Sequence, residues 1–285
     1  MRSVQKWGLA AVIAAMASPV SAQIISTSIP KGLEGKTAKT AAFHVMVSPF
    51  AKWKYGEVYL DPNDVFGTIE GKPNSDFMVA AEGAFGNPAS LNFAVGGWYN
   101  KIGTNPFDFF GYDSALQLGS INATIDTDLT VIEGHGGVYY KNFGVQIGIV
   151  KTSGDFKGGT VTKVNGNTVP ATAFTLDVPK ADTTDWDAFL VYKQGFGEGS
   201  KTPVNLAIGA GLYRKAGEET APIRGVDAQT VPSLFVSAGV GLFKGFGIDA
   251  SFWYIGETDA TKGANNTEFA SDTQTRMMVG IGYSF

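Results

Sequence analysis

Residues 275–285 read TRMMVGIGYSF, and every second position from Met277 onward carries an apolar side chain. The positions between them include Gly280, Gly282 and Ser284, which are small or polar. Successive side chains of a β-strand point to opposite faces, so this period of two predicts a strand with one apolar face. The apolar row consists of Met277, Val279, Ile281, Tyr283 and Phe285.

Three segments further upstream repeat this alternation, at residues 203–216, 231–243 and 246–258. Each has apolar residues on one face and glycine, serine or other small and polar residues on the other face. The sheets of soluble sandwiches alternate in the same way, so the pattern alone does not choose between a sandwich and a barrel.

The lengths of the connections favour a barrel. Short turns, such as KNF at 141–143, alternate with long polar connections at 154–183, 217–230 and 259–272. Membrane-spanning barrels have short turns at one end and longer loops at the other. We therefore predict an all-β fold, a transmembrane antiparallel up-and-down β-barrel of about ten strands, with eight to twelve open. The strands counted are 52–60, 75–85, 90–100, 128–141, 143–153, 184–196, 203–216, 231–243, 246–258 and 277–285.

One further candidate strand, AAFHVMVSPF at 41–50, would raise the number to twelve if it found a partner. The connection at 101–127 is too long for a tight turn, and the predicted topology places it among the long loops. Such a loop either folds into the lumen as a constriction or packs down onto the barrel. The candidate constriction residues are Phe107, Phe109, Phe110 and Tyr112.

The first 22 residues have the three parts of a secretory signal peptide. Arg2 and Lys6 supply a basic start, an apolar run follows from Trp7 to Met16, and small residues precede Ala22. The apolar run is too short for a membrane-spanning helix. We expect cleavage after Ala22. The expected organisation is a signal peptide at 1–22, a periplasmic lead-in at 23–40 and a barrel at 41–285.

Composition excludes several classes of protein. The absence of cysteine excludes disulfide frameworks and thiolate metal sites. A net charge of −4 without any basic stripe argues against a nucleic-acid partner. Charged residues make up only 17% of the chain and there are 37 glycines, a mixture typical of β proteins that are poor in surface charge.

With these features together, residues 41–285 resemble the bacterial outer-membrane β-barrel proteins as a class. The segment MMVGIGYSF resembles the C-terminal assembly signal of that class, carried here by Val279, Ile281, Tyr283 and Phe285. The resemblance implies a Gram-negative outer-membrane location. It also implies contact with outer-membrane lipid and lipopolysaccharide, and recognition by the barrel-assembly machinery and periplasmic chaperones. No single family within the class is identified, and the oligomeric state stays open.

Candidate chemistry is sparse. The chain has two histidines, His44 and His135, and no motif brings a nucleophile to the latter. Glu133 lies close enough in sequence to orient the His135 ring. Acidic residues occur in predicted loops without the spacing of a calcium site. We therefore predict no catalytic residue, no metal site and no cofactor.

Charged residues on the faces opposite the apolar rows are candidates for lining the lumen. These are Glu82, Asp249 and Arg276, which either border a water path or pair with one another and close it. The expected function is that of a porin-like passive channel or a structural barrel with surface-exposed loops. An outer-membrane enzyme that hydrolyses lipid or peptide and a secreted soluble β-sandwich are the alternatives.

Overall fold

The structure is a computed structural model that describes residues 40–284 with some gaps. The gaps are residues 55–57, 62–64, 72–74, 88–89, 104, 114–119, 176–179, 198–201, 217–227, 244, 258, 260, 263–267 and 270–272. The predicted signal peptide, nearly all of the predicted lead-in, and Phe285 lie outside the described residues.

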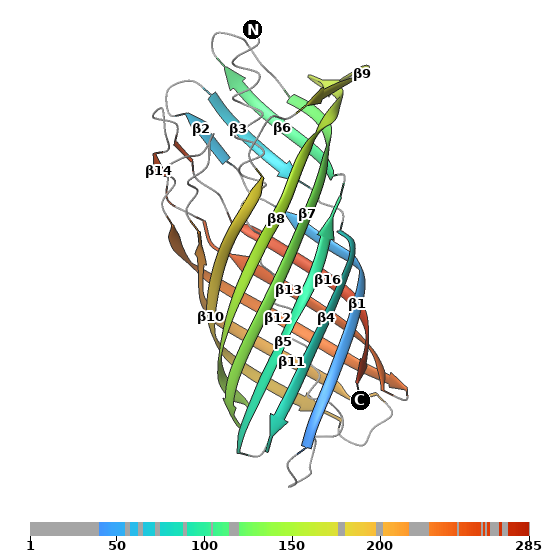
Figure 1. Cartoon of the computed structure of the whole chain (residues 1–285), viewed down its shortest axis with the longest axis vertical. Helices are drawn as coiled ribbons and strands as arrows, with labels where there is room; N and C mark the ends of the chain where they lie inside the picture. The colour runs from blue at the N-terminus through green and yellow to red at the C-terminus, as the bar shows by residue number, and fades with distance from the viewer. Residues whose placement is uncertain are drawn as a thin grey trace.

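Within the described residues, ten antiparallel strands close into a barrel (Figure 1). Each barrel strand pairs with the barrel strands before and after it in sequence, and β1 pairs with β16 to close the sheet. This confirms the predicted up-and-down barrel and excludes the soluble sandwich. The ten strands are β1 (Thr40–Lys54), β4 (Ser75–Gly86), β5 (Leu91–Ile102), β7 (Ser120–Tyr140), β8 (Phe143–Val164), β10 (Ala181–Phe196), β11 (Val204–Lys215), β12 (Gln229–Phe243), β13 (Phe246–Ile255) and β16 (Gln274–Ser284).

The first barrel strand differs from the one that was counted in the sequence. The strand predicted at 52–60 is divided between two strands. Its first three residues end β1 (Thr40–Lys54), which also contains the 41–50 candidate, and residues 58–60 belong to β2 (Val58–Asp61). A register shift against β16 between Val47 and Phe50 breaks the alternation of β1 in the middle. A bulge of this kind moves later side chains to the other face, which explains why the sequence pattern divided one strand into two.

The two ends of the barrel differ as predicted. At one end short connections of two to seven residues join β4 to β5, β7 to β8, β10 to β11 and β12 to β13, and β1 begins and β16 ends there. The turn between β7 and β8 holds only two residues, of which Lys141 has a positive φ of 54°. The long connections all lie at the opposite end. We call these the short-turn end and the long-loop end.

Much of the sequence predicted as long loops is in fact β-sheet. Pairing of β7 with β5 stops at Leu129 and that of β8 with β10 stops at Gly154, yet β7 and β8 remain paired up to Ile121 and Val164. The predicted loops 101–127 and 154–183 were therefore wrong as loops over these residues. Threonine and valine are frequent in these segments, and such β-branched residues favour strands even where the sequence is polar.

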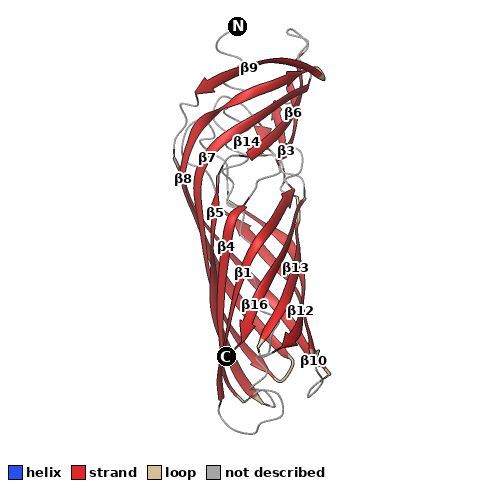
Figure 2. Ribbon diagram, turned by 90° about the vertical axis from the view of Figure 1, so that its right-hand side faces the viewer, coloured by secondary structure: helices blue, strands red, loops and turns tan. Residues whose placement is uncertain are grey.

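This part of the molecule beyond the barrel is a six-stranded antiparallel sheet in the order β2-β3-β6-β7-β8-β9. We call it the extension, and Figure 2 shows it above the barrel. It consists of residues 120–128 of β7 and 155–164 of β8, with β2 (Val58–Asp61), β3 (Val65–Gly71), β6 (Asn105–Asp113) and β9 (Asn167–Thr175). A separate pair, β14 (Thr261–Lys262) and β15 (Glu268–Phe269), lies in the last long connection.

Candidate functional site in the barrel lumen

Every barrel strand carries exposed apolar side chains on the outer face. In β12, for example, Leu234 and Val236 are exposed, whereas Ser233, Phe235 and Ser237 are buried. The same alternation places apolar side chains outward around the whole barrel, where water would be an unfavourable neighbour. We call this surface the apolar belt. It includes Phe43, Val45, Phe85, Phe93, Val95, Ile132, Val138, Val145, Ile147, Leu190, Ile208, Leu212, Leu234, Val236, Ile248, Phe252, Val279 and Ile281.

Charged groups face outward above the belt, towards the long-loop end. Lys101 lies 3.3 Å from Asp128, and Lys151 lies 2.7 Å from Asp182. Each of these side chains is more than 40% exposed. The outward face thus changes from apolar to charged where the strands rise towards the extension, as expected at the border between lipid and water.

The inner face is packed. Every one of the ten barrel strands contributes an inward side chain that is at most 1% exposed. Side chains that line an open aqueous channel remain wet, so this degree of burial indicates a lumen that is filled at this level. The ten residues are Ser48, Met78, Asn100, Val131, Val150, Phe189, Tyr213, Phe235, Trp253 and Met278.

An aromatic cluster fills one side of the lumen. Phe235 stacks on Trp253 with 4.8 Å between ring centroids, and Phe189 meets both rings edge to face at 5.2 and 5.5 Å. The three side chains come from β12, β13 and β10. Aromatic pairs in these arrangements contribute about 0.5–1.5 kcal/mol each beyond the burial of their area.

A charged cluster in the lumen joins side chains of β7, β4 and β10. His135 lies between two carboxylates, with 2.9 Å from Nδ1 to Glu133 and 3.2 Å from Nε2 to Glu82. The ammonium of Lys193 lies 3.7 Å from Glu82 and 4.2 Å above the ring of Tyr139. Two acidic and two basic side chains thus balance in charge, which a buried cluster requires.

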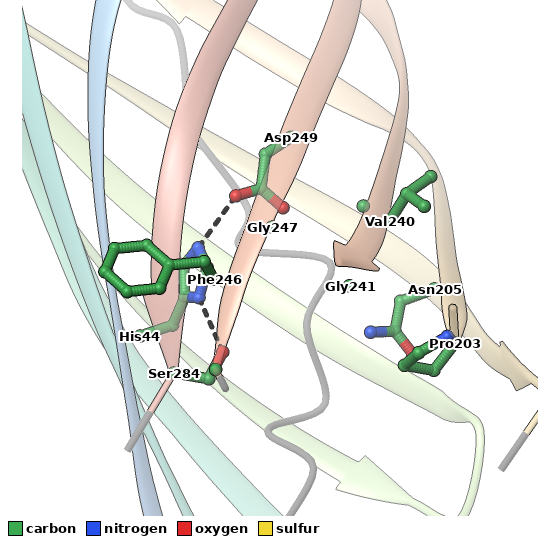
Figure 3. A pocket seen from close by; sticks show the side chains of 11 residues that line it. His44, Pro203, Asn205, Val240, Gly241, Phe246, Gly247, Asp249 and Ser284 are labelled. Atoms are coloured by element: carbon green, nitrogen blue, oxygen red, sulfur yellow. Dashed lines mark hydrogen bonds and ion pairs between the residues drawn. The ribbon is translucent and has the colours of Figure 1, made fainter. Parts of the chain in front are cut away.

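A second polar cluster lies at the short-turn end. The His44 ring is 2.9 Å from the Ser284 hydroxyl through Nδ1 and 2.9 Å from the Asp249 carboxylate through Nε2 (Figure 3). His44 and Asp249 are buried, whereas Ser284 is half-buried. A small pocket of about 30 Å³ adjoins the three residues.

Inward glycines make room for both histidines. His135 of β7 reaches Glu82 of β4 across Gly96 of β5, where an added Cβ would lie 2.7 Å from His135 Nε2. His44 of β1 reaches Asp249 across Gly282 of β16, where an added Cβ would collide with both side chains. In each case the missing side chain allows an ion pair or hydrogen bond to span an intervening strand.

The long-loop end of the lumen is also polar. Asp185 of β10 is fully buried, accepts a hydrogen bond from the Tyr213 hydroxyl, and accepts a second from the backbone N–H of Ala216 at 2.7 Å. Lys215 and Arg276 are also buried inward side chains. Buried polar groups of this kind need such partners to offset the loss of water.

The structure places the candidate lumen residues on the inner face. Glu82 belongs to the charged cluster and Asp249 to the cluster at the short-turn end. Arg276 is 1% exposed and lies nearer the long-loop end than either of them. The sequence did not predict that Glu82 or Asp249 contacts a histidine, because each histidine partner lies on another strand.

The candidate assembly residues lie on the closing strand. Val279 and Ile281 face outward in the apolar belt, and the Tyr283 ring packs 4.7 Å from that of Phe246. Phe285 lies outside the described residues. Their role in assembly stays a prediction.

The candidate constriction segment is strand β6 rather than a loop. Its backbone pairs with β3 and β7 in the extension. The side chains of Phe107, Phe109, Phe110 and Tyr112 lie outside what the structure describes, so their part in a constriction stays a prediction.

Sequence reasoning missed His44, Ser284 and Lys193 as members of lumen clusters. His44 alternates with the outward Phe43 and Val45, a signal that would have placed it inward if 41–50 had been read as a strand. Ser284 lies between the apolar residues of the last strand, but its histidine partner lies 240 residues away. Lys193 carried no signal beyond its place in a predicted strand.

Among the residues that the structure describes, no group of three or more histidine or acidic side chains is placed to hold a metal ion. Across the same ranges, no helix is long and apolar enough to cross a membrane.

The closed sheet, the apolar belt and the filled interior together define a membrane-spanning β-barrel. No protein-family model and no curated protein sequence matches the chain. Among solved structures, the outer membrane protease OmpT from Escherichia coli aligns with 11% identity and a TM-score of 0.49, over 88% of this chain and 99% of that one.

Two other solved structures are similar at a lower score. The translocator domain of the autotransporter NalP from Neisseria meningitidis has 12% identity and a TM-score of 0.45, covering 89% of this chain and 91% of its own. The COG4313 outer membrane channel from Pseudomonas putida F1 has 9% identity and a TM-score of 0.38, covering 90% and 100%. Similarity at these scores assigns no activity to this chain.

Proposed function

We propose that this protein is an outer-membrane barrel of a Gram-negative-type bacterium that anchors its β-sheet extension outside the cell and does not pass solutes passively. Of the two functions expected from the sequence, this is the structural barrel with surface-exposed segments rather than the porin-like channel. The apolar belt supports the membrane location, and the packed lumen supports the absence of a permanent pore.

The observation that carries the proposal is the burial of the lumen. Inward side chains from all ten strands are at most 1% exposed, and they include the large rings of Phe235, Trp253 and Tyr213. A water-filled path needs continuous space between such side chains, and the close packing at this level leaves none. The charged cluster around His135 is a second barrier to solutes, because its charged groups are paired with one another and not with water.

The extension would supply such a barrel with a β-sheet surface outside the membrane. β7 and β8 are 21 and 22 residues long, whereas β11 and β16 have 12 and 11. The additional length is hydrogen-bonded sheet, and residues 162–168 at its tip are exposed and, apart from Val164 and Gly166, polar. A long hydrogen-bonded sheet holds its shape better than a flexible loop, which suits a surface for contact outside the cell.

Conductance in planar bilayers tests the closed lumen. We expect the purified, folded protein to give no steady conductance. The double variant Phe235→Ala with Trp253→Ala should give open events, because it removes two large rings from the packed level. A stable pore in the unchanged protein would contradict the proposal.

Epitope insertion tests the orientation. A tag between Asn165 and Gly166, in the turn from β8 to β9, should be labelled on intact cells. A matched tag between Lys141 and Asn142, at the short-turn end, should be labelled only after the outer membrane is permeabilised. The reverse labelling pattern would overturn the proposed orientation.

The proposed partners are outer-membrane lipid and lipopolysaccharide around the belt, and the barrel-assembly machinery and periplasmic chaperones during biogenesis. The outward row of Val279 and Ile281 on the closing strand supports this, because that strand must be recognised and then pair with β1. Replacing Phe285 with a charged residue should reduce the amount of assembled barrel, measured by heat-modifiable migration, while export continues. Unchanged assembly would count against it.

A further inference from the structure

The cluster at the short-turn end has the chemical parts of an activated nucleophile. His44 contacts a hydroxyl through one ring nitrogen and a carboxylate through the other, each at 2.9 Å. An ionised carboxylate only accepts hydrogen bonds, so His44 Nε2–H donates to Asp249. In the neutral ring Nδ1 then carries a lone pair, and it accepts the O–H of Ser284.

This arrangement follows the logic of a serine hydrolase. A base that is oriented by a carboxylate removes the proton of the hydroxyl when the oxygen attacks. Serine proteases use the two ring nitrogens in the opposite order, with the carboxylate on Nδ1. The order does not change the chemistry, because either imidazole nitrogen acts as a base once the other is protonated.

A pocket adjoins the hydroxyl. Figure 3 shows it bordered by His44, Asp249 and Ser284 on one side and by Asn205 on the other. Glycines provide much of its wall, which is why space remains there. Its volume of about 30 Å³ accommodates a group of only a few heavy atoms.

Asn205 is an independent indication that the pocket takes a ligand. Its side chain lines the pocket and is 7% exposed, and its Oδ1 has no hydrogen-bond partner among the described residues. A buried amide without a partner is costly unless something occupies the site. An N–H of the same amide would stabilise an oxyanion formed in the pocket.

From this geometry we propose that Ser284 is the nucleophile of a hydrolase site for short-chain carboxylic esters, open at the short-turn end of the barrel. Ser284 Oγ attacks the carbonyl carbon while its proton passes to His44 Nδ1. Collapse of the tetrahedral intermediate breaks the ester C–O bond, and the alcohol leaves with that proton. Water then attacks the acyl carbonyl carbon while its proton passes to His44 Nδ1. The bond from this carbon to Ser284 Oγ breaks, Oγ takes the proton back from His44, and the carboxylic acid leaves.

The other histidine shows why the assignment falls on His44. Both ring nitrogens of His135 contact carboxylates, so the ring has no lone pair for a hydroxyl. Its charged cluster fits a structural role. His44 and His135 are both buried across an inward glycine, but only His44 has a serine on its second nitrogen.

Covalent labelling tests the nucleophile. The full-length protein, folded in detergent, is incubated with a fluorophosphonate that carries short alkyl groups, and the added mass is located by peptide mass spectrometry. We expect one adduct on Ser284, with release of fluoride. Folding of each variant is verified by heat-modifiable migration.

Four variants separate catalysis from structure. Ser284→Ala should abolish the adduct, and His44→Ala and Asp249→Asn should slow it by at least about 100-fold, the lower limit for loss of a general base. Ser251→Ala, a buried inward serine on the same strand as Asp249, should leave the rate unchanged. The same ranking is expected for hydrolysis of p-nitrophenyl acetate.

A cysteine variant gives a second measurement. The chain has no cysteine, so Ser284→Cys introduces a single thiol. If His44 is the base, iodoacetamide should alkylate this thiol at pH 6 much faster than in the double variant with His44→Ala. Equal rates in the two proteins, or an unlabelled Ser284 in the folded protein, would overturn the hydrolase site. Neither result would bear on the conductance test.

Discussion

Strands β7 and β8 run through both the barrel and its extension, yet their side chains are arranged differently in the two regions. Within the barrel, residues 131–140 of β7 alternate strictly between buried and exposed positions. Beyond it, residues 162–168 at the tip of β8 and the start of β9 are exposed on both faces. Hydrogen bonding continues through both regions, whereas the regular alternation of buried inner and exposed apolar outer side chains along β7 is a property of the barrel.

The difference shows that lipid and a packed lumen, not strand formation, impose the alternation. A strand in the bilayer must place apolar groups outward and fill the interior on its other face. A strand above the bilayer needs only its backbone partners. We therefore expect substitutions to be costly in the barrel and mild in the extension.

The largest effect is expected for Trp253→Ala. This ring is 1% exposed and stacks on Phe235 at 4.8 Å. Its removal leaves a cavity and should lower the free energy of unfolding by about 3–5 kcal/mol. Denaturant unfolding followed by circular dichroism measures the change. The control Thr168→Ala in the extension should stay within about 0.5 kcal/mol, and equal losses would contradict the comparison.

Next in size is Val236→Arg, midway along β12 in the apolar belt. Arginine facing lipid near the bilayer centre costs about 2–4 kcal/mol. Thr168→Arg introduces the same charge on the exposed β9 and should change stability by about 0.5 kcal/mol or less. Unfolding in lipid vesicles gives both values. A neutral Val236→Arg would mean that this face does not meet lipid.

Glycine substitutions test whether His135 packs across an inward-facing glycine of the neighbouring strand. A Cβ at Gly96 would lie 2.7 Å from His135 Nε2 and 2.8 Å from the Ala81 carbonyl oxygen. We expect Gly96→Ala to cost about 1–3 kcal/mol, the usual range for overpacking. Gly136 on the neighbouring strand has nothing within 4 Å of its added Cβ, so Gly136→Ala should be nearly neutral. Similar effects for the two, measured by unfolding, would count against the His135 cluster.

The smallest effect is expected for Asp182→Asn. Its pair with Lys151 spans 2.7 Å, but the two side chains are 70% and 54% exposed. Exposed ion pairs contribute about 0–1 kcal/mol, and salt screens them. The loss should therefore vanish in high salt. A loss of stability above this range that persists in high salt would show that the Lys151–Asp182 pair is shielded from water.

Prediction from sequence worked where a strand meets lipid on one side. In β11, β12, β13 and β16 the apolar rows face outward as the pattern indicated. It failed at β1, where a register shift after Val47 divides the pattern, and in the extension, where polar strands resemble loops. The Asn165–Gly166 turn, with φ values of 51° and 76°, is a strong hairpin signal that marks β8 and β9 in hindsight.

By itself, the sequence determined the class of fold, the lipid-facing rows and the distinction between the two ends, because these follow from alternation and loop length along the chain. Only the tertiary structure decided that the lumen is filled and that His44 meets Ser284 and Asp249. Those partners lie 240 and 205 residues from His44. They become neighbours when β1 pairs with β16. Local alternation shows which side chains face inward, but not which of them meet when the sheet closes.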